Sequence, residues 1–105
     1  MIELTHFQKL VLDLVKNSDR KNPITGARLT YLVGVKEEEG KTGANMRSII
    51  HALRTKGYPI CANDKGYWWP NDRQELQDYI ESLEGRIMSQ TKALSALRGG
   101  FDQIE

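Results

Sequence analysis

In three stretches of the first half of the chain, apolar residues recur every three or four positions among polar ones. Each stretch predicts a short α-helix. The first, over residues 5–17, opens with a Thr-x-x-Gln capping box. The second spans residues 25–34, and residues 23–25 before it predict a short strand. The third spans residues 42–57, between a threonine N-cap and a glycine stop. The apolar positions are Phe7, Leu10, Val11 and Leu14, then Ala27, Leu29, Leu32 and Val33, then Met46, Ile49, Ile50 and Leu53.

A short two-stranded ribbon is predicted directly after the third helix. Residues 58–62 have a strand pattern, with Ile60 and Ala62 on one face. Residues 63–66 are turn formers, and residues 67–69 are aromatic and β-prone. Two strands this short must lie against helices, so we expect one of the two tryptophans to pack inward.

A 4-3 spacing of apolar residues predicts a long helix over residues 71–98 with a heptad seam. Asp72 and Glu75 form a capping box before it, and Gly99-Gly100 is expected to end it. A helix of about 28 residues is roughly 42 Å long, which exceeds what so small a domain covers. The helix is therefore predicted to make a dimer, with Gly85 as the point where it could bend. The seam residues are Leu76, Ile80, Leu83, Ile87, Gln90, Leu94 and Leu97.

The orientation of that pairing is left open by the sequence. Isoleucine and leucine alternate along much of the seam, which favours a parallel two-stranded coiled coil. Residues 72–84 carry a net charge of −4 and residues 86–98 a net charge of +3, which favours an antiparallel pair. The same charge polarity also complements the dipole of a single helix.

Charge is unevenly distributed in the rest of the chain as well. The whole chain has a net charge of +1, but residues 41–69 carry +4. On the predicted third helix, small polar and basic residues lie opposite the apolar stripe, which suits entry into a major groove. A local basic face on a nearly neutral protein favours sequence-selective over bulk binding of nucleic acid.

The helix and ribbon together resemble the winged-helix DNA-binding family, in particular the N-terminal domain type of biotin-operon repressors. The family pattern Ile-x-x-Leu-Arg-x-x-Gly, a strand and then Lys-Gly-Tyr is matched by Ile50, Leu53, Arg54, Gly57, Lys65, Gly66 and Tyr67. The resemblance covers roughly residues 5–70. It implies that the exposed helix face (Arg47, Ser48, His51) and the wing lysine (Lys65) contact DNA. The full predicted set of DNA-binding residues is Lys41, Thr42, Asn45, Arg47, Ser48, His51, Arg54 and Lys65.

Two alternatives from another functional class stay open. The family usually has a short Gly-x-Ser link before the recognition helix, whereas this chain has residues 35–41 with three consecutive glutamates. Glutamates beside such a helix would repel phosphate, which leaves room for a protein partner instead of DNA. The chain could also be an adaptor whose main role is its coiled coil.

Enzymatic, metal-binding and membrane functions have little support in the sequence. Gly40-Lys41-Thr42 imitates the end of a phosphate-binding loop, but Val35 stands where such a loop needs glycine. His6, His51 and Cys61 lack the spacing of metal ligands. A single cysteine favours a cytoplasmic setting, and we expect neither a signal peptide nor a membrane span.

The sequence therefore predicts an α+β protein: a winged helix-turn-helix of three helices and a short β-ribbon, followed by a coiled-coil helix. The predicted domains are residues 1–70, the dimerisation helix 71–98 and a flexible tail 99–105. The expected function is sequence-selective binding of double-stranded DNA by a small homodimer, without cofactors. Its expected role is control of transcription or replication, as in the compact prophage and bacterial regulators that it resembles.

Overall fold

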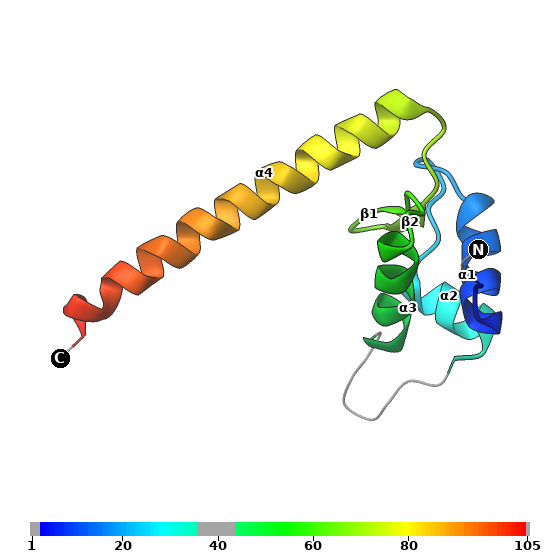
Figure 1. The fold of residues 1–105 in the computed structure, drawn as a ribbon, viewed down its shortest axis with the longest axis horizontal. Helices are drawn as coiled ribbons and strands as arrows, with labels where there is room; N and C mark the ends of the chain where they lie inside the picture. The colour runs from blue at the N-terminus through cyan, green and yellow to red at the C-terminus, as the bar shows by residue number, and fades with distance from the viewer. Residues whose placement is uncertain (1–2, 36–43, 105) are drawn as a thin grey trace. The chain divides into compact units, whose positions relative to one another are not determined.

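A computed structural model describes residues 3–35 and 44–104 (Figure 1). Its elements, in chain order, are the helices α1 (His6–Lys16), α2 (Gly26–Val33) and α3 (Ala44–Thr55), the strands β1 (Cys61–Asn63) and β2 (Gly66–Trp68), the helix α4 (Arg73–Arg98) and a 3-10 helix, η1 (Gly99–Gln103). The chain divides into two compact units, Met1–Asp72 (the N-terminal unit) and Arg73–Glu105 (the C-terminal unit). Three helices, an antiparallel hairpin and a long final helix confirm the predicted fold class, a winged-helix-like topology.

Local capping interactions set the ends of the first two helices, and the capping box predicted for the first is confirmed. The Thr5 N–H donates to Oε1 of Gln8 at 3.0 Å, and the Gln8 N–H donates to the Thr5 hydroxyl at 3.2 Å. The hydroxyl of Thr25 accepts the N–H of Arg28 at 3.0 Å at the start of α2. Gly34 ends α2 in the left-handed region, with φ at 80°. Each bond satisfies a backbone donor that the first turn of a helix leaves without a partner.

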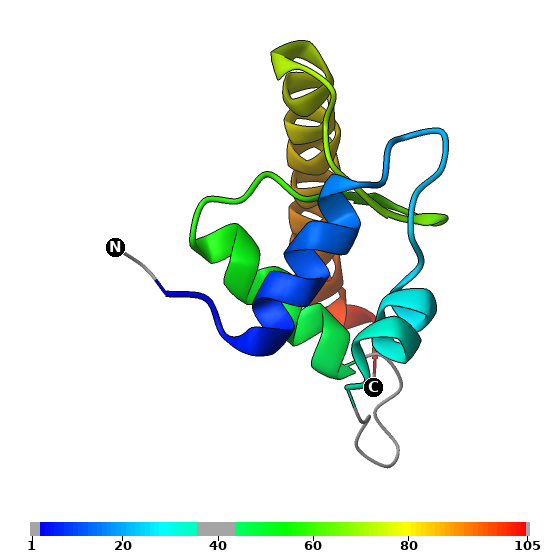
Figure 2. The ribbon, with the colours of Figure 1, turned by 90° about the vertical axis from the view of Figure 1, so that its right-hand side faces the viewer.

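The three helices of the N-terminal unit pack into one bundle around a single core (Figure 2). The predicted stripe of α3 is confirmed, since Met46, Ile50 and Leu53 are buried and Ile49 packs against the core. The buried core residues are Val11, Leu12, Val15, Leu29, Val33, Met46, Ile50, Leu53 and Ile60.

The predicted core faces of α1 and α2 were wrong in part. Phe7 and Leu32 are more than 40% exposed, at 42% and 45%, and Ala27 is exposed as well. Leu12, which is not among the apolar positions predicted for the core, is buried instead. α1 contacts both α2 and α3. Its buried face is therefore centred between two neighbours, on Val11, Leu12 and Val15, rather than on the stripe that begins at Phe7.

The hairpin is shorter than the predicted ribbon. Cys61 pairs with Trp68 and Asn63 with Gly66, which leaves a two-residue loop. The Ile60 N–H donates to the Tyr58 carbonyl at 2.9 Å, and this tight turn precedes β1. Strand alternation therefore starts only at Cys61, and both Ile60 and Cys61 are buried. The prediction that Ile60 and Ala62 share the inner face was wrong, while the predicted inward tryptophan is confirmed as Trp68.

The predicted strand before α2 is confirmed as a one-residue bridge to the hairpin. Ile24 and Tyr67 exchange both backbone hydrogen bonds, each at 2.8 Å. A side chain at Gly66 would collide with the Ile24 carbonyl, and Gly66 also has a positive φ of 139°. Glycine is therefore required at the point where the segment leading into α2 meets the hairpin.

The C-terminal unit consists of α4 and η1. α4 is one continuous helix of 26 residues that passes through Gly85 without a break. It ends at Arg98, and the predicted tail contains η1. Within α4, all of whose residues are described, no side chain is buried. None of the described helices is both long and apolar enough to span a membrane.

Candidate nucleic-acid interface

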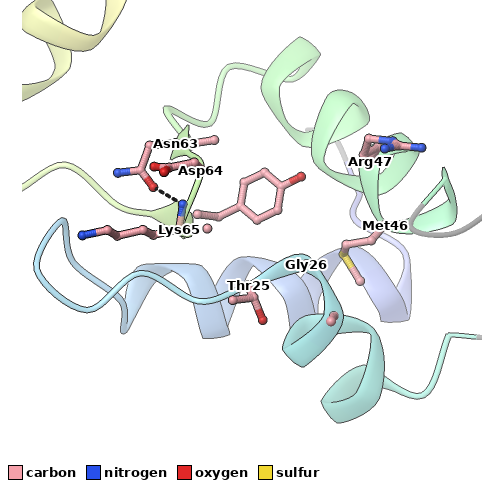
Figure 3. Close-up of a pocket in the computed structure, with 11 residues that line it drawn as sticks. Thr25, Gly26, Met46, Arg47, Asn63, Asp64 and Lys65 are labelled. Atoms are coloured by element: carbon pink, nitrogen blue, oxygen red, sulfur yellow. Dashed lines mark hydrogen bonds between the residues drawn. The ribbon is translucent and has the colours of Figure 1, made fainter.

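Three elements of the N-terminal unit surround one open pocket of about 310 Å³ (Figure 3). The N-terminal end of α2 contributes residues 25–27, the start of α3 contributes Met46 and Arg47, and the hairpin contributes residues 62–67. Because α3 and the tip of the hairpin share this pocket, a ligand that touches one of them is within reach of the other.

The outer face of α3 consists of Arg47, Ser48, His51 and Thr55. All four side chains are exposed, and they lie opposite the buried stripe of Met46, Ile50 and Leu53. Ser48 is small, so its side of the helix allows close approach of another surface. Arg47 belongs to this face and also lines the pocket, and its guanidinium extends away from the hairpin (Figure 3). The predicted exposure of Arg47, Ser48 and His51 is therefore confirmed.

The tip of the hairpin is held by a local side-chain bond. Oδ1 of Asn63 accepts the Lys65 N–H at 2.8 Å, which is the geometry of an Asx turn. Asn63, Asp64 and Lys65 are all exposed, and the Lys65 ammonium extends outward on the opposite side of the pocket from Arg47 (Figure 3). The Ile24–Tyr67 bridge connects this hairpin to the segment that leads into α2. The backbone of the tip is thus anchored on both sides while the lysine side chain stays in solvent.

Arg54 differs from the other predicted interface residues. Its Nε donates to the Ile60 carbonyl at 2.8 Å, and the side chain is half-buried. This bond joins the last turn of α3 to the segment just before β1. Arg54 is in the predicted DNA-binding set, but in the structure this arginine contributes to the fold through a charge-assisted bond.

The remaining predicted residues take less part in the surface. Asn45 is half-buried and already has an interaction within the protein. Lys41 and Thr42, together with the predicted N-cap role of Thr42, lie outside the described residues. Residues 25–27 also line the pocket, although no sequence pattern assigned them to a binding surface. Thr25 could have indicated that this segment belongs to a binding surface. A threonine at the start of a helix places the backbone N–H groups of the first turn at a surface.

The pocket carries both cationic and anionic side chains. Its lining holds two cationic side chains, Arg47 and Lys65, and one carboxylate, Asp64. Among the described residues, no group of three or more His, Cys, Asp or Glu side chains is placed to hold a metal ion. Cys61, the single cysteine of the chain, is fully buried.

No protein-family model matches this sequence, and comparisons with curated proteins and with solved structures find no match either. The winged-helix-like arrangement therefore rests on the order and packing of its own elements.

Proposed function

We propose that the N-terminal unit binds double-stranded DNA sequence-selectively, through the outer face of α3 and the tip of the hairpin. The observation that carries the proposal is the shared pocket: Arg47 from α3 and Lys65 from the hairpin line one open hollow. Two cations on separate elements, beside a helix face of small polar residues, suit a ligand with a regular array of phosphates.

The dimensions and side chains of α3 fit a major groove. The groove is about 12 Å wide and admits one α-helix. On this proposal, Ser48 and His51 face the base edges, where a hydroxyl and an imidazole form hydrogen bonds. Arg47 reaches a phosphate or a guanine edge, and Lys65 contacts a backbone phosphate. This assignment separates the residues that select the DNA sequence from the residues that supply the affinity for DNA.

The biological role proposed with this activity is that of a small dimeric regulator of transcription or replication. A net charge of +1 over the whole chain gives little nonspecific attraction to nucleic acid. Selection among sites therefore depends on α3 and on the presence of two copies, because a second contact made from the same dimer is effectively intramolecular.

A salt-titrated binding assay tests the proposal. Fluorescence anisotropy with random and with genomic DNA fragments should show affinity falling as salt rises, with a log–log slope of about −0.9 per neutralised phosphate. Arg47→Ala/Lys65→Ala should weaken binding at least about 10-fold and reduce the slope by about 2. The matched control is Lys9→Ala/Lys92→Ala, which removes two exposed positive charges from α1 and α4 and should bind like the wild type.

Two results would count against DNA as the ligand: no binding at low salt by folded protein, or equal binding by the two double variants. A protein partner then becomes the better proposal. One observation favours it as a second candidate: α2 exposes Tyr31 at 80% and Leu32 at 45%, an apolar pair of the kind found in protein interfaces.

A further inference from the structure

The seam of α4 is an apolar surface that the described structure leaves open. α4 is a single uninterrupted helix, and none of its side chains is buried (Figure 1). Its seam residues follow one another at spacings of four and three residues, and so lie along one face of the helix. The exposed apolar residues of this face, at 36% to 75%, are Ile80, Leu83, Ile87, Leu94 and Leu97. Such a face leaves water only when a second surface covers it.

The seam consists of two alternating sets of positions. The first set is Ile80, Ile87 and Leu94. The second set is Leu76, Leu83, Gln90 and Leu97. In a parallel, in-register pair of helices each seam residue meets its own counterpart, whereas in an antiparallel pair the first set meets the second. Isoleucine in the first set and leucine in the second is the pattern of parallel two-stranded coiled coils.

Gln90 is the polar residue of this seam, and its partner depends on the orientation. In the parallel pair the two Gln90 side chains meet, and the amide of each can donate to the carbonyl oxygen of the other. Two antiparallel registers cover the seam from Ile80 to Leu94 with residues of α4 alone, and they place Gln90 against Ile80 or against Ile87. An amide buried beside isoleucine loses its hydrogen bonds to water and gains none. Gln90 therefore favours the parallel pair.

The charges beside the seam favour the same orientation. In the parallel pair, Glu84 faces Tyr79 of the other copy and Arg86 faces Thr91, and no two charges of the same sign meet at these flanking positions. The antiparallel register that sets the acidic half of α4 against the basic half is centred on residue 85. That register places Glu84 beside Glu84 and Arg86 beside Arg86 of the other copy, and both contacts are repulsive.

The remaining charges of the apolar part of α4 do not select an orientation. Glu75, Asp78, Glu81 and Lys92 occupy positions on the outer side of the helix, away from the seam. Acidic residues toward the start of a helix and basic residues toward its end also complement the dipole of a single helix. The charge polarity along α4 therefore needs no partner.

We propose that the seam binds α4 of a second copy of the chain, parallel and in register, with the two Gln90 side chains hydrogen-bonded to each other in the interface. A second copy supplies a seam of the same length with an amide at the same level. Each N-terminal unit ends at Asp72, directly before α4, so this pairing joins both N-terminal units to the same end of the paired helices. The consequence that both units reach one stretch of DNA rests on the proposed function, whereas the pairing itself does not.

Complementary charges at position 90 test whether the two side chains meet. Gln90→Glu and Gln90→Lys should each weaken self-association at least about 10-fold, because like charges then meet in the interface. An equimolar mixture should return to within about 3-fold of the wild type, because the mixed dimer brings a carboxylate to an ammonium group. Sedimentation equilibrium on the full-length protein, without DNA, measures all three.

The control pair for this test is Gln74→Glu and Gln74→Lys, on the outer side of α4. Both should associate like the wild type, alone and mixed. In either antiparallel register each charge at position 90 would face an isoleucine, and mixing would restore nothing. A mixture of the two Gln90 variants as weak as its components would therefore overturn the proposal.

Cysteines at the two ends of the seam test the orientation independently. Leu76→Cys and Leu97→Cys, each alone, should form a covalent dimer in a buffer of oxidised and reduced glutathione, because equivalent seam residues meet across a parallel pair. In the two antiparallel registers the same cysteines would be about 25 Å or more apart along the helix axis. Ala96→Cys, on the outer side of α4, is the control and should stay monomeric on a non-reducing gel, as should the wild type with its buried Cys61. Absence of the covalent dimer for either seam variant, or equal crosslinking of Ala96→Cys, would overturn the proposal.

Discussion

The two units differ in how far their apolar side chains are buried. Apart from Leu32, the described leucine, isoleucine and valine residues of the N-terminal unit are buried in one core or packed against it, with Leu29 and Leu53 fully inaccessible. α4 of the C-terminal unit has no buried side chain, although its apolar residues recur as regularly as those of α3. A regular apolar pattern therefore predicts that a face needs a partner, but the partner can be in the same chain or outside it.

This difference has an energetic consequence. Burial of a Leu or Ile side chain contributes about 1.5–3 kcal/mol to stability, and the N-terminal unit gains this contribution internally. An isolated helix in water is held mainly by its own backbone bonds and is marginal even at favourable composition. Glycine in its interior costs about 1 kcal/mol more, and Gly85 is in the middle of α4. We therefore expect that α4 is more stable as a helix when it is paired than when it is alone.

The largest expected effect comes from placing charge on the α4 seam. Leu83→Glu/Leu94→Glu should weaken self-association at least about 1,000-fold and give a monomer at micromolar concentration, because each glutamate would enter a dry interface. The control Ser82→Glu/Ser95→Glu adds the same charges on the outer side of α4 and should remain dimeric. Light scattering distinguishes the two. A dimeric seam variant would mean that α4 does not make the contact.

A matched pair of leucine truncations sharpens the contrast between the units. Leu53→Ala should lower the free energy of unfolding of the N-terminal unit by about 2–5 kcal/mol, because it leaves a cavity in the core. Leu97→Ala removes a side chain that is 75% exposed and should leave that transition unchanged. Urea unfolding followed by tryptophan fluorescence reports this unit, since both tryptophans are at positions 68 and 69. Equal losses for both variants would show that the units do not unfold independently.

A glycine pair tests how the hairpin is anchored. Gly66→Ala should destabilise the N-terminal unit by about 1–3 kcal/mol, through its positive φ and its collision with the Ile24 backbone. Gly34→Ala meets no atoms within 4 Å, and its loss should be limited to about 1 kcal/mol from the left-handed backbone. Thermal unfolding compares them. If Gly34→Ala costs as much as Gly66→Ala, the contact with Ile24 is not what requires glycine.

A smaller effect is expected at the tip of the hairpin. Lys65→Ala should weaken binding to all DNA sequences alike, about 3-fold to 5-fold, and reduce the salt slope by about 1. Lys9→Ala is the control, as an exposed lysine on α1. Anisotropy titrations on two unrelated DNA sequences measure both quantities, and a loss confined to one sequence would assign Lys65 to base recognition instead.

The last expected effect is a change in which DNA sequence is preferred, with little change in overall affinity. Ser48→Ala and His51→Ala should each alter the preferred base at one or two positions, with a discrimination change of about 1–3 kcal/mol per position. Selection from a random DNA library measures it, with Lys9→Ala as the reference. An unchanged site for both variants would contradict the placement of this face in the groove.

The sequence by itself determined the elements that depend on neighbouring residues. The Thr5–Gln8 capping box, the Thr25 cap and the glycine stops are interactions within a few residues, and helix ends followed from them. The same holds for the outer face of α3 and the exposed lysine at the hairpin tip, since a helical stripe defines its opposite side. The apolar seam of α4 could likewise be identified from the sequence, because a heptad repeat is recognised without knowledge of the fold.

Where the local sequence is compatible with more than one side chain being buried or bonded, only the tertiary structure decided between them. α1 buries Leu12 instead of Phe7 because it has two neighbouring helices, and no local signal gives their positions. Arg54 bonds to the Ile60 carbonyl, six residues away across a turn whose path the sequence did not specify. The requirement for Gly66 comes from Ile24, more than 40 residues earlier in the chain. Contacts between distant segments depend on how helices pack, whereas sequence patterns report only the conformational preferences of each segment by itself.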